Sequence, residues 1–425
     1  MKLLIKNGRV IDPASQTDVK SDILTEDGKI KRIAATIKEK ADKTIDAKGC
    51  FVMPGFVDLH VHLRDPGYEE KETVVTGARA AAKGGFTTIL AMPNTRPVAD
   101  NEDVVSYVHQ KARNLAPVHV HQIGAITRGQ EGRKLSDIRR MVQAGIPAIS
   151  EDGRSVMHTA VYYKAMQIAK EEGIPVFAHC EDVHLAAGGV MNAGARAQEL
   201  QLPGILNEVE DTIVARDIVL AKGVGVHLHL CHCSTKGSVF MVEQAKKEGV
   251  CVTAEACPHH FTLSEDDIPE DDANYKMNPP LRSREDREAI REGLKSGVID
   301  VIATDHAPHA AIEKGRSMKR APFGIVGLET AAALTYTELV LQGYLTPLQM
   351  AEKLSYNPAR IIGSERGRIQ EGAPADLVVF DPRQTYRICA KEFVGKSKNT
   401  PFDGREVTGK VVATIVSGEV AYSDY

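Results

Sequence analysis

The chain has 425 residues, of which 43% are hydrophobic and 26% are charged, and its formal net charge is -4. This length suits one large α/β domain with a smaller one beside it, and the composition is that of a globular protein. The charge balance argues against nucleic acid as a main partner, and the absence of a long apolar run argues against a membrane protein. Seven cysteines without framework spacing fit a reducing compartment, so we expect a cytoplasmic protein.

Both ends of the chain are predicted to be rich in β-strands. Residues 1–52 contain short strands and turns, with little helical periodicity. Strand-like runs return in residues 365–425, at 375–380 and 411–416. We therefore expect the two ends to pair into one small β-sandwich-like domain.

Residues 53–364 alternate between short apolar runs and amphipathic segments of helical length, which is typical of βα units around a parallel sheet. Eight units over this length match a (β/α)8 barrel of the TIM type. The predicted fold class is therefore α/β, a barrel with a small β domain built from both chain ends. The eight apolar runs lie near residues 55–62, 86–92, 118–125, 145–152, 174–180, 225–232, 250–257 and 299–305.

The first predicted barrel strand, 55–62, ends in two histidines. Side chains two apart in a strand point to the same face, so Asp58, His60 and His62 share one side. Two imidazoles on one strand can form half of a divalent-metal site. Alternating histidines also occur in ordinary strands, so the position must decide. In this fold, active sites lie at the C-terminal ends of the strands, where His60 and His62 stand.

Position along the strand also separates the other histidine pairs. His119 and His121 open their strand and are expected to pack on the far side of the barrel. In the strand 225–232, alternation predicts that His232 points inward on the face of Leu228 and Leu230. The other face then holds His227, His229, Cys231 and Cys233, which are expected to be packing residues rather than metal ligands.

Four further strand ends carry potential ligands: Asp152, His179, His232 and Asp305. Each one alone is more simply a solvated loop residue or a helix cap. Together with His60 and His62 they place six nitrogen and oxygen donors at one rim, which predicts a metal site. Imidazole and carboxylate donors suit zinc better than magnesium or calcium, and two ions would leave a net charge that attracts an anion.

Seven motifs resemble, in the same order and at similar spacing, the class I bacterial dihydroorotases of the amidohydrolase superfamily. The resemblance runs from Met1 to the last predicted strand, and its motifs are highly specific. They are HVHLRDPG at 60–67, MPNT at 92–95, SEDG at 150–153, CHCSTK at 231–236, KMNPPLR at 276–282, TDHAPH at 304–309 and APFG at 321–324.

The resemblance implies a binuclear zinc centre. His60, His62 and Asp305 would hold the first ion, His179 and His232 the second, and Asp152 would bridge both; a site with one zinc stays open. Most members of the superfamily bridge their metals with a carboxylated lysine. Hydantoinases, dihydropyrimidinases and most allantoinases keep that lysine, so an aspartate at this position argues against them.

The resemblance also implies the reaction, the reversible conversion of N-carbamoyl-L-aspartate and L-dihydroorotate in de novo pyrimidine (UMP) biosynthesis. A metal-bound hydroxide would be the nucleophile, with Asp305 as general acid and base. Arg64, Asn94 and His309 would hold the substrate carboxylate. The ring would contact Asn278 and the backbone of Phe323 and Gly324.

Several roles stay open at this stage. Arg64 could instead form a surface ion pair with Asp65 or Glu69. Asp58 is a candidate to hydrogen-bond a ligand imidazole, and His306 is a candidate to orient a ligand from outside the metal's own ligands. Residues 310–320 could form either a mobile lid or a merely solvated loop.

Three other functions compete with this hypothesis. One is a related cyclic amidohydrolase such as an allantoinase or hydantoinase. The second is an inactive relative that scaffolds aspartate transcarbamoylase, and the third is a structural interaction protein; an intact set of six donors disfavours both. For an active enzyme we expect a small-molecule substrate and a homodimer, and an association with aspartate transcarbamoylase stays open.

Overall fold

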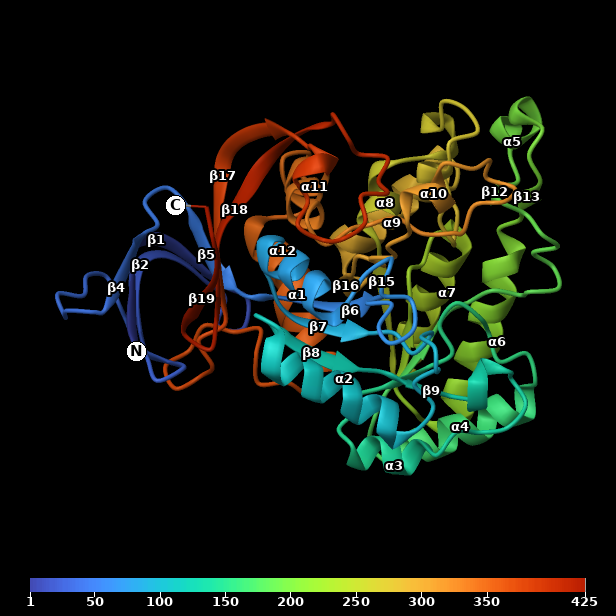
Figure 1. The fold of residues 1–425 in the computed structure, drawn as a ribbon, viewed down its shortest axis with the longest axis horizontal. Coiled ribbons are helices and arrows are strands. Elements are labelled where there is room, and N and C mark those ends of the chain that lie inside the picture. The colour runs from blue at the N-terminus through green and yellow to red at the C-terminus, as the bar shows by residue number, and fades with distance from the viewer. Residues whose placement is uncertain (425) are drawn as a thin grey trace.

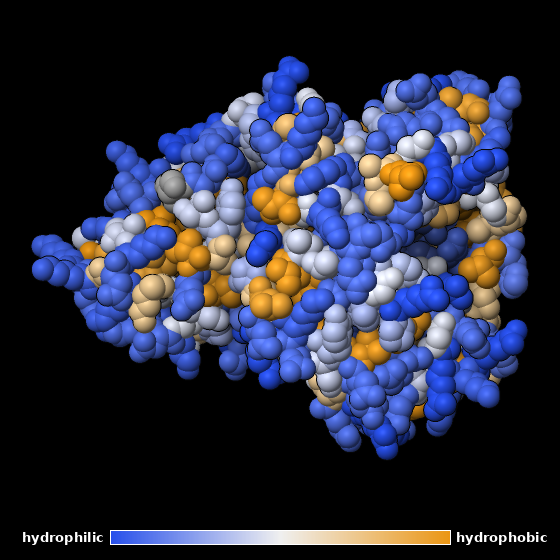
Figure 2. Space-filling model, viewed as in Figure 1, coloured by the Kyte–Doolittle hydropathy of each residue, from blue (hydrophilic) through white to orange (hydrophobic). Residues whose placement is uncertain are grey.

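The computed structural model describes residues 1–424 and shows a β-sheet beside a helix-covered barrel (Figure 1). Both termini lie in the part formed by the sheet. The hydrophobic residues visible on one face lie in separate groups among hydrophilic side chains (Figure 2). Among the described residues, no helix has both the length and the apolar character of a membrane span.

The sheet joins the two ends of the chain, as the fold class predicts. Its strands run in the order β19-β18-β17-β5-β1-β2-β3, and β4 pairs with β1. β5 provides the link between the ends, because it is parallel to β1 and antiparallel to β17. The strands are β1 (Lys2–Asp12), β2 (Thr17–Glu26), β3 (Lys29–Ala34), β4 (Lys43–Asp46), β5 (Phe51–Pro54), β17 (Leu377–Arg387), β18 (Glu406–Val416) and β19 (Glu419–Ser423). No observation tests the domain bounds 1–52, 53–364 and 365–425, which stay predictions.

The barrel consists of parallel strands at the eight predicted places. Hydrogen bonds connect β6-β7-β8 in one sheet and β9-β10-β11-β14-β15-β16 in another, and β8 continues into β9 after one residue. The strands are β6 (Phe56–Val61), β7 (Phe86–Ala91), β8 (His119–Gln122), β9 (Gly124–Ala125), β10 (Ile149–Ser150), β11 (Val176–Ala178), β14 (Leu228–Leu230), β15 (Val252–Ala256) and β16 (Val301–Ile302).

Contacts between the first and last strands close the barrel. The backbone N–H of His62 donates to the carbonyl oxygen of His306 at 2.8 Å. Four residues before His62 along the chain, Asp58 accepts hydrogen bonds from the backbone N–H and the hydroxyl of Thr304, at 3.1 and 2.6 Å. A buried carboxylate therefore connects β6 to the segment that follows β16.

Helices cover the outside of the barrel, and their apolar faces supply most of its core. Side-chain caps mark where several begin: Thr73 caps α1, Thr235 caps α7 and Ser283 caps α9. The longer helices are α1 (Val74–Lys83), α2 (Glu102–Leu115), α4 (Thr159–Glu171), α6 (Glu208–Val224), α7 (Lys236–Lys247) and α9 (Arg284–Ser296). Shorter ones are α3 (Ile138–Gln143), α5 (Ala195–Leu200), α8 (Pro258–Thr262), α10 (Ala311–Lys314), α11 (Ala331–Thr335), α12 (Pro347–Ala351) and α13 (Asn357–Ile361). Two further short strands, β12 (Met191–Asn192) and β13 (Gly204–Ile205), pair with each other.

Candidate metal centre and active site

The strand ends of the barrel surround a cavity of about 180 Å³. Five of the six predicted ligands line it, and the sixth, His60, lies just beneath with no exposed surface. The six predicted substrate-binding residues line the same cavity: Arg64, Asn94, Asn278, His309, Phe323 and Gly324. The structure thus brings both predicted sets together, although their roles toward metal and substrate stay predictions.

The first group of donors consists of His60, His62 and Asp305. Their ligand atoms lie within 4.8 Å of one another, and all three residues are buried. The Asp305 Oδ1 atom is 3.1 Å from the His62 Nε2 atom and 3.5 Å from the His60 Nε2 atom. This is the set that the resemblance assigns to a first metal ion.

A second group forms around Asp152 at the end of β10. Its Oδ1 atom lies 3.1 Å from His60 Nε2, 3.7 Å from His179 Nδ1 and 3.8 Å from His232 Nε2. Its Oδ2 atom faces the other side, 3.4 Å from His62 Nε2. One carboxylate thus reaches the histidines of both predicted metal sites, as a bridging ligand must.

Buried lone pairs without partners show that these residues fit a metal. The His60 Nε2 and Asp152 Oδ1 atoms are buried and, although 3.1 Å apart, make no hydrogen bond of acceptable geometry with each other or with any other described residue. The His179 Nδ1 and His232 Nε2 atoms point at each other across 2.9 Å. Leaving such groups unsatisfied is costly, and a divalent cation between them would satisfy several at once.

The two carboxylates are held in their anionic form. Burial favours the neutral acid, but the histidines around Asp152 outweigh burial and keep the pKa of its carboxyl well below the ordinary value. Burial also opposes ionisation of Asp305, but its contacts with His62 and His60 outweigh burial and lower the pKa of this carboxyl. Both side chains can therefore act as charged ligands at neutral pH.

Partners behind the histidines set their tautomers. His60 Nδ1 lies 2.8 Å from Glu255, His62 Nδ1 lies 2.9 Å from the Asn94 amide oxygen, and His179 Nε2 lies 3.0 Å from Glu181. Each acceptor favours a proton on the nitrogen that it faces and leaves the other nitrogen free toward Asp152 and Asp305.

Glu255 is the site residue that sequence reasoning missed. Besides His60, it accepts hydrogen bonds from the His232 backbone N–H at 3.2 Å and contacts His229 Nε2 at 2.9 Å. A signal was present in the sequence, because Glu255 is the one charged residue of the apolar run 250–257. A fully buried charge in a strand requires a partner, and here the partners are imidazoles.

The role predicted for Asp58 is wrong: it bonds no ligand imidazole and instead accepts from the backbone N–H of His60 and from Thr304. The role predicted for His306 stays a prediction, since its backbone carbonyl oxygen accepts from the N–H of His62 at 2.8 Å while its side chain faces elsewhere. Its Nδ1 atom accepts from the backbone N–H of Gly327, and its Nε2 atom lies 3.7 Å from Glu72.

The prediction for the faces of the strand 225–232 is also wrong. Leu228 and Leu230 belong to the core cluster shared with α7, so they face outward. His229 faces inward, with its ring centroid 4.6 Å from that of Phe177. His232 still reaches the site because β14 ends at Leu230, and the positive φ of His232 (34°) turns its side chain back toward Asp152.

Cys231 also departs from the predicted arrangement. It packs in the interior cluster with Phe177 and Ala303, whereas Cys233 belongs to the outer cluster. The two sulfurs therefore do not share a face. Both cysteines are buried, as predicted.

Arg64 does not form the alternative surface ion pair. Its guanidinium donates to the Pro308 carbonyl oxygen and lies 3.2 Å from His309 Nε2, and no carboxylate within the described chain pairs with it. Asp65 instead contacts Lys111, and Glu69 accepts from a backbone N–H. A cation without a counter-ion at the wall of this cavity is suited to an anionic ligand.

His309 lies between Arg64 and the pocket wall. Its Nε2 atom also contacts the Phe323 carbonyl oxygen at 2.8 Å. Burial, and the positive charge of Arg64 beside it, lower the pKa of His309 to about 2. The ring is therefore neutral at physiological pH.

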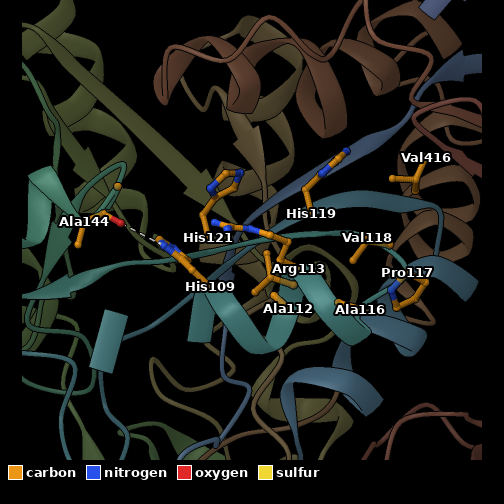
Figure 3. A pocket seen from close by; sticks show the side chains of 12 residues that line it. His109, Ala112, Arg113, Ala116, Pro117, Val118, His119, His121, Ala144 and Val416 are labelled. Carbon is orange, nitrogen blue, oxygen red and sulfur yellow. Dashed lines mark hydrogen bonds between the residues drawn. The ribbon is translucent and has the colours of Figure 1, made fainter. Parts of the chain in front are cut away.

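The histidine pair of β8 lies elsewhere, as predicted. His119 and His121 line a larger pocket of about 540 Å³ together with His109 and Arg113 (Figure 3). The C-terminal ends of α2 and α3 border this pocket, and His109 bonds the Ala144 carbonyl oxygen there. This larger pocket holds none of the strand-end carboxylates, so the smaller cavity is the better candidate for an active site.

Comparison with known proteins agrees with the geometry. The model of the amidohydrolase family matches residues 51–421. A dihydroorotase from Pelotomaculum thermopropionicum is 48% identical over 100% of this chain and 99% of its own length, and one from Clostridioides difficile is 47% identical over 99% and 100%. The L-hydantoinase (dihydropyrimidinase) from Arthrobacter aurescens has a similar structure, with a TM-score of 0.88 and 29% identity over 99% of this chain and 96% of its own.

The fold is thus shared with hydantoinases, whereas the higher sequence identity lies with dihydroorotases. The (β/α)8 barrel with its added β domain is confirmed by this structural match and by the observed strand order. The chain belongs to the amidohydrolase family and, within it, to the dihydroorotases.

Proposed function

We propose that the protein is a zinc-dependent dihydroorotase that interconverts L-dihydroorotate and N-carbamoyl-L-aspartate. The observation that carries this proposal is an unpaired Arg64 facing two groups of metal-binding side chains across one small cavity. Full-length identity of 45–48% to proteins named dihydroorotase supports the same substrate.

The proposed metal centre has two ions, one at His60, His62 and Asp305, the other at His179 and His232. Asp152 would bridge them. When bound, such ions acidify water and polarise a carbonyl group. The nitrogen-rich donor set favours zinc, and the one-ion alternative is decided by metal analysis.

The chain's own residues would supply proton transfer and orientation. In the hydrolytic direction, water adds to the ring carbonyl carbon and the ring C–N bond breaks. Asp305, which is anionic and lines the cavity, would take a proton from the attacking water and deliver it to the leaving nitrogen. The reverse steps close the ring.

The other cavity residues would bind the substrate. Arg64 and Asn94, with the neutral His309, would hold the carboxylate, while Asn278 and the backbone at Phe323 and Gly324 would face the ring; all six residues line the cavity. Arg64 has a positive φ of 60°, an unfavourable conformation for a non-glycine residue that is often found at functional sites.

A direct assay tests the proposal. We expect the purified protein to hydrolyse L-dihydroorotate, to contain about two zinc ions per chain, and to lose activity with a chelator and regain it with zinc. Allantoin and hydantoin serve as competing substrates, and faster turnover of either would contradict the assignment.

Arg64→Met is the matched variant for the substrate carboxylate. We expect it to lower kcat/KM for dihydroorotate by about 10²-fold or more, because a buried charged hydrogen bond is lost. Hydantoin is neutral and lacks that carboxylate, so the kcat/KM for hydantoin should fall much less. Equal losses on both substrates would refute the role of Arg64.

The remaining expectations are also proposals. Homodimer formation and association with aspartate transcarbamoylase are tested by light scattering of the protein alone and mixed with that enzyme. A cytoplasmic location is tested by fractionation of the cells that produce it.

A further inference from the structure

Two lysines lie buried behind the cavity wall that Phe323 and Gly324 form. The exposed fraction is 4% for Lys276 and 6% for Lys314. Neither ammonium group forms an ion pair with a carboxylate in the described chain; both are surrounded by backbone carbonyl groups instead. Buried lysines are rare, so this pair requires an explanation.

Lys314 uses its three N–H bonds on three carbonyl oxygens. Its Nζ atom donates to Gly324 at 2.8 Å, to Pro322 at 3.1 Å and to Lys276 at 3.2 Å. Three donors require the protonated amine, because a neutral amine has only two N–H bonds. Lys314 is the last residue of α10, so these bonds tie the segment 310–320 to the cavity wall. For this segment the sequence leaves both a mobile lid and a solvated loop open.

Lys276 binds the neighbouring residues of the loop 318–324. Its Nζ atom donates to the carbonyl oxygens of Met318 and Ala321, each at 2.6 Å. The same ammonium lies 4.1 Å from the centroid of the Phe323 ring, which is within the range of a cation–π contact. Between them, the lysines bind four carbonyl groups of residues 318–324.

This loop forms part of the cavity wall and contacts His309. The Phe323 carbonyl oxygen contacts His309, and the Gly324 backbone N–H donates to the Lys276 carbonyl oxygen at 2.9 Å. Gly324 has a φ of +125°, and a Cβ there would lie 2.5 Å from the Ala307 Cβ, so the loop fits against the strand-end segment with little tolerance. A movement of this loop would therefore be felt at His309 and at the cavity wall.

We propose that Lys276 and Lys314 are positioning residues that fix the 318–324 loop, and through it the substrate-binding wall of the cavity. Their ammonium groups offset the mutual repulsion of converging carbonyl dipoles and hold Phe323 and Gly324 against His309. The inference deepens the proposed function, on which it rests for the identity of the substrate.

The electrostatic surroundings make this positioning dependent on pH. Burial lowers the pKa of Lys314 to about 7, and the Lys276 ammonium adds to that effect; burial also lowers the pKa of Lys276 to about 8. Asp271, Asp272 and Glu313 face the pair and favour the charged forms. As pH rises through this range Lys314 loses the third N–H that one of its carbonyl contacts needs, and Lys276 loses the charge of its cation–π contact, so the loop should loosen.

Lys314→Met tests the proposal, with Lys314→Arg as the conservative variant and Lys319→Met as the control on the exposed side of the same segment. In the metal-loaded enzyme we expect Lys314→Met to raise KM for dihydroorotate about tenfold or more with a smaller change in kcat. Lys314→Arg should recover part of the loss, and Lys319→Met should match the wild type. The wild-type KM should rise between pH 6.5 and 9 more steeply than that of Lys314→Met.

Hydrogen exchange gives a readout that needs no substrate. We expect faster amide exchange in residues 315–324 of Lys314→Met and unchanged exchange in the barrel strands. Unchanged KM and unchanged exchange in a folded Lys314→Met protein would overturn the proposal. If that variant does not fold, Lys276→Met is measured in the same way and decides. A wild type without dihydroorotate turnover would refute the proposed function, whereas the exchange experiment would still report on the loop.

Discussion

At the scale of single residues, the site depends on partners behind the predicted ligands as much as on the ligands themselves. Glu255 contacts the rings of His60 and His229 and the backbone of His232. Burial would raise the pKa of its carboxyl, but these imidazoles outweigh burial and lower it to about 2. A permanent anion thus lies directly beneath the proposed metals.

Glu255→Gln is therefore expected to weaken metal binding about 10–100-fold, because an amide no longer accepts well from both rings. Metal content after dialysis at several free zinc concentrations measures the effect. Asp376→Asn is the matched control, since Asp376 is also buried but pairs with Arg366 and His119, none of which lines the cavity. Similar metal loss in both variants would show a general effect of burial rather than a role for Glu255.

At the scale of elements, the closure between β6 and β16 is the contact on which the strand ends depend. Asp58 is fully buried there, and burial raises the pKa of its carboxyl to about 6 against the opposing effect of the Thr304 hydroxyl. His60 follows Asp58 by two residues in β6, and Asp305 directly follows Thr304 after the end of β16. Closing the barrel and assembling the first metal site are therefore one structural event.

Thr304→Val should destabilise the protein by about 1–3 kcal/mol, since a buried carboxylate loses a charged hydrogen bond. Thr304→Ser keeps the hydroxyl and should recover most of the loss. Urea unfolding monitored by circular dichroism gives both values. A Val variant as stable as the Ser variant would contradict the role given to this bond.

At the scale of the whole molecule, buried neutral histidines make stability depend on pH. Burial, together with a neighbouring histidine, lowers the pKa of His121 and of His227 to about 4 each. Below pH 6.5 the unfolded chain takes up protons at these rings that the folded chain refuses until about pH 4. Stability contributed by their neutral form is thus present above pH 6.5 and is lost as pH falls through this window.

Between pH 7.5 and pH 5, proton uptake by each of the two rings in the unfolded chain should lower the free energy of unfolding by about 1–2 kcal/mol. Urea midpoints at the two pH values should differ less in the His121→Asn, His227→Asn double variant than in the wild type. His184→Asn, at an exposed position, is the control. A double variant with the wild-type pH dependence would refute this origin.

How far the sequence predicts the molecule follows from how local each signal is. The period of apolar residues located all eight barrel strands, and the rule that chemistry lies at strand ends selected His179 and Asp305 correctly as cavity residues. The same alternation failed at 225–232, because the strand ends two residues before His232 and a positive φ reorients that side chain. The alternation of side chains between two faces does not predict the residue at which a strand ends.

Fold class, family and the residues around the cavity were predictable from the sequence, because periodicity and contiguous motifs are properties of neighbouring residues. The groups that stand behind the cavity residues are recognisable only in the folded chain. Glu255 beneath His60, and the lysines behind Phe323 and Gly324, act across sequence separations that no local pattern encodes. Burial gives these long-range contacts their strength, since a charge removed from water must find its partner in the fold.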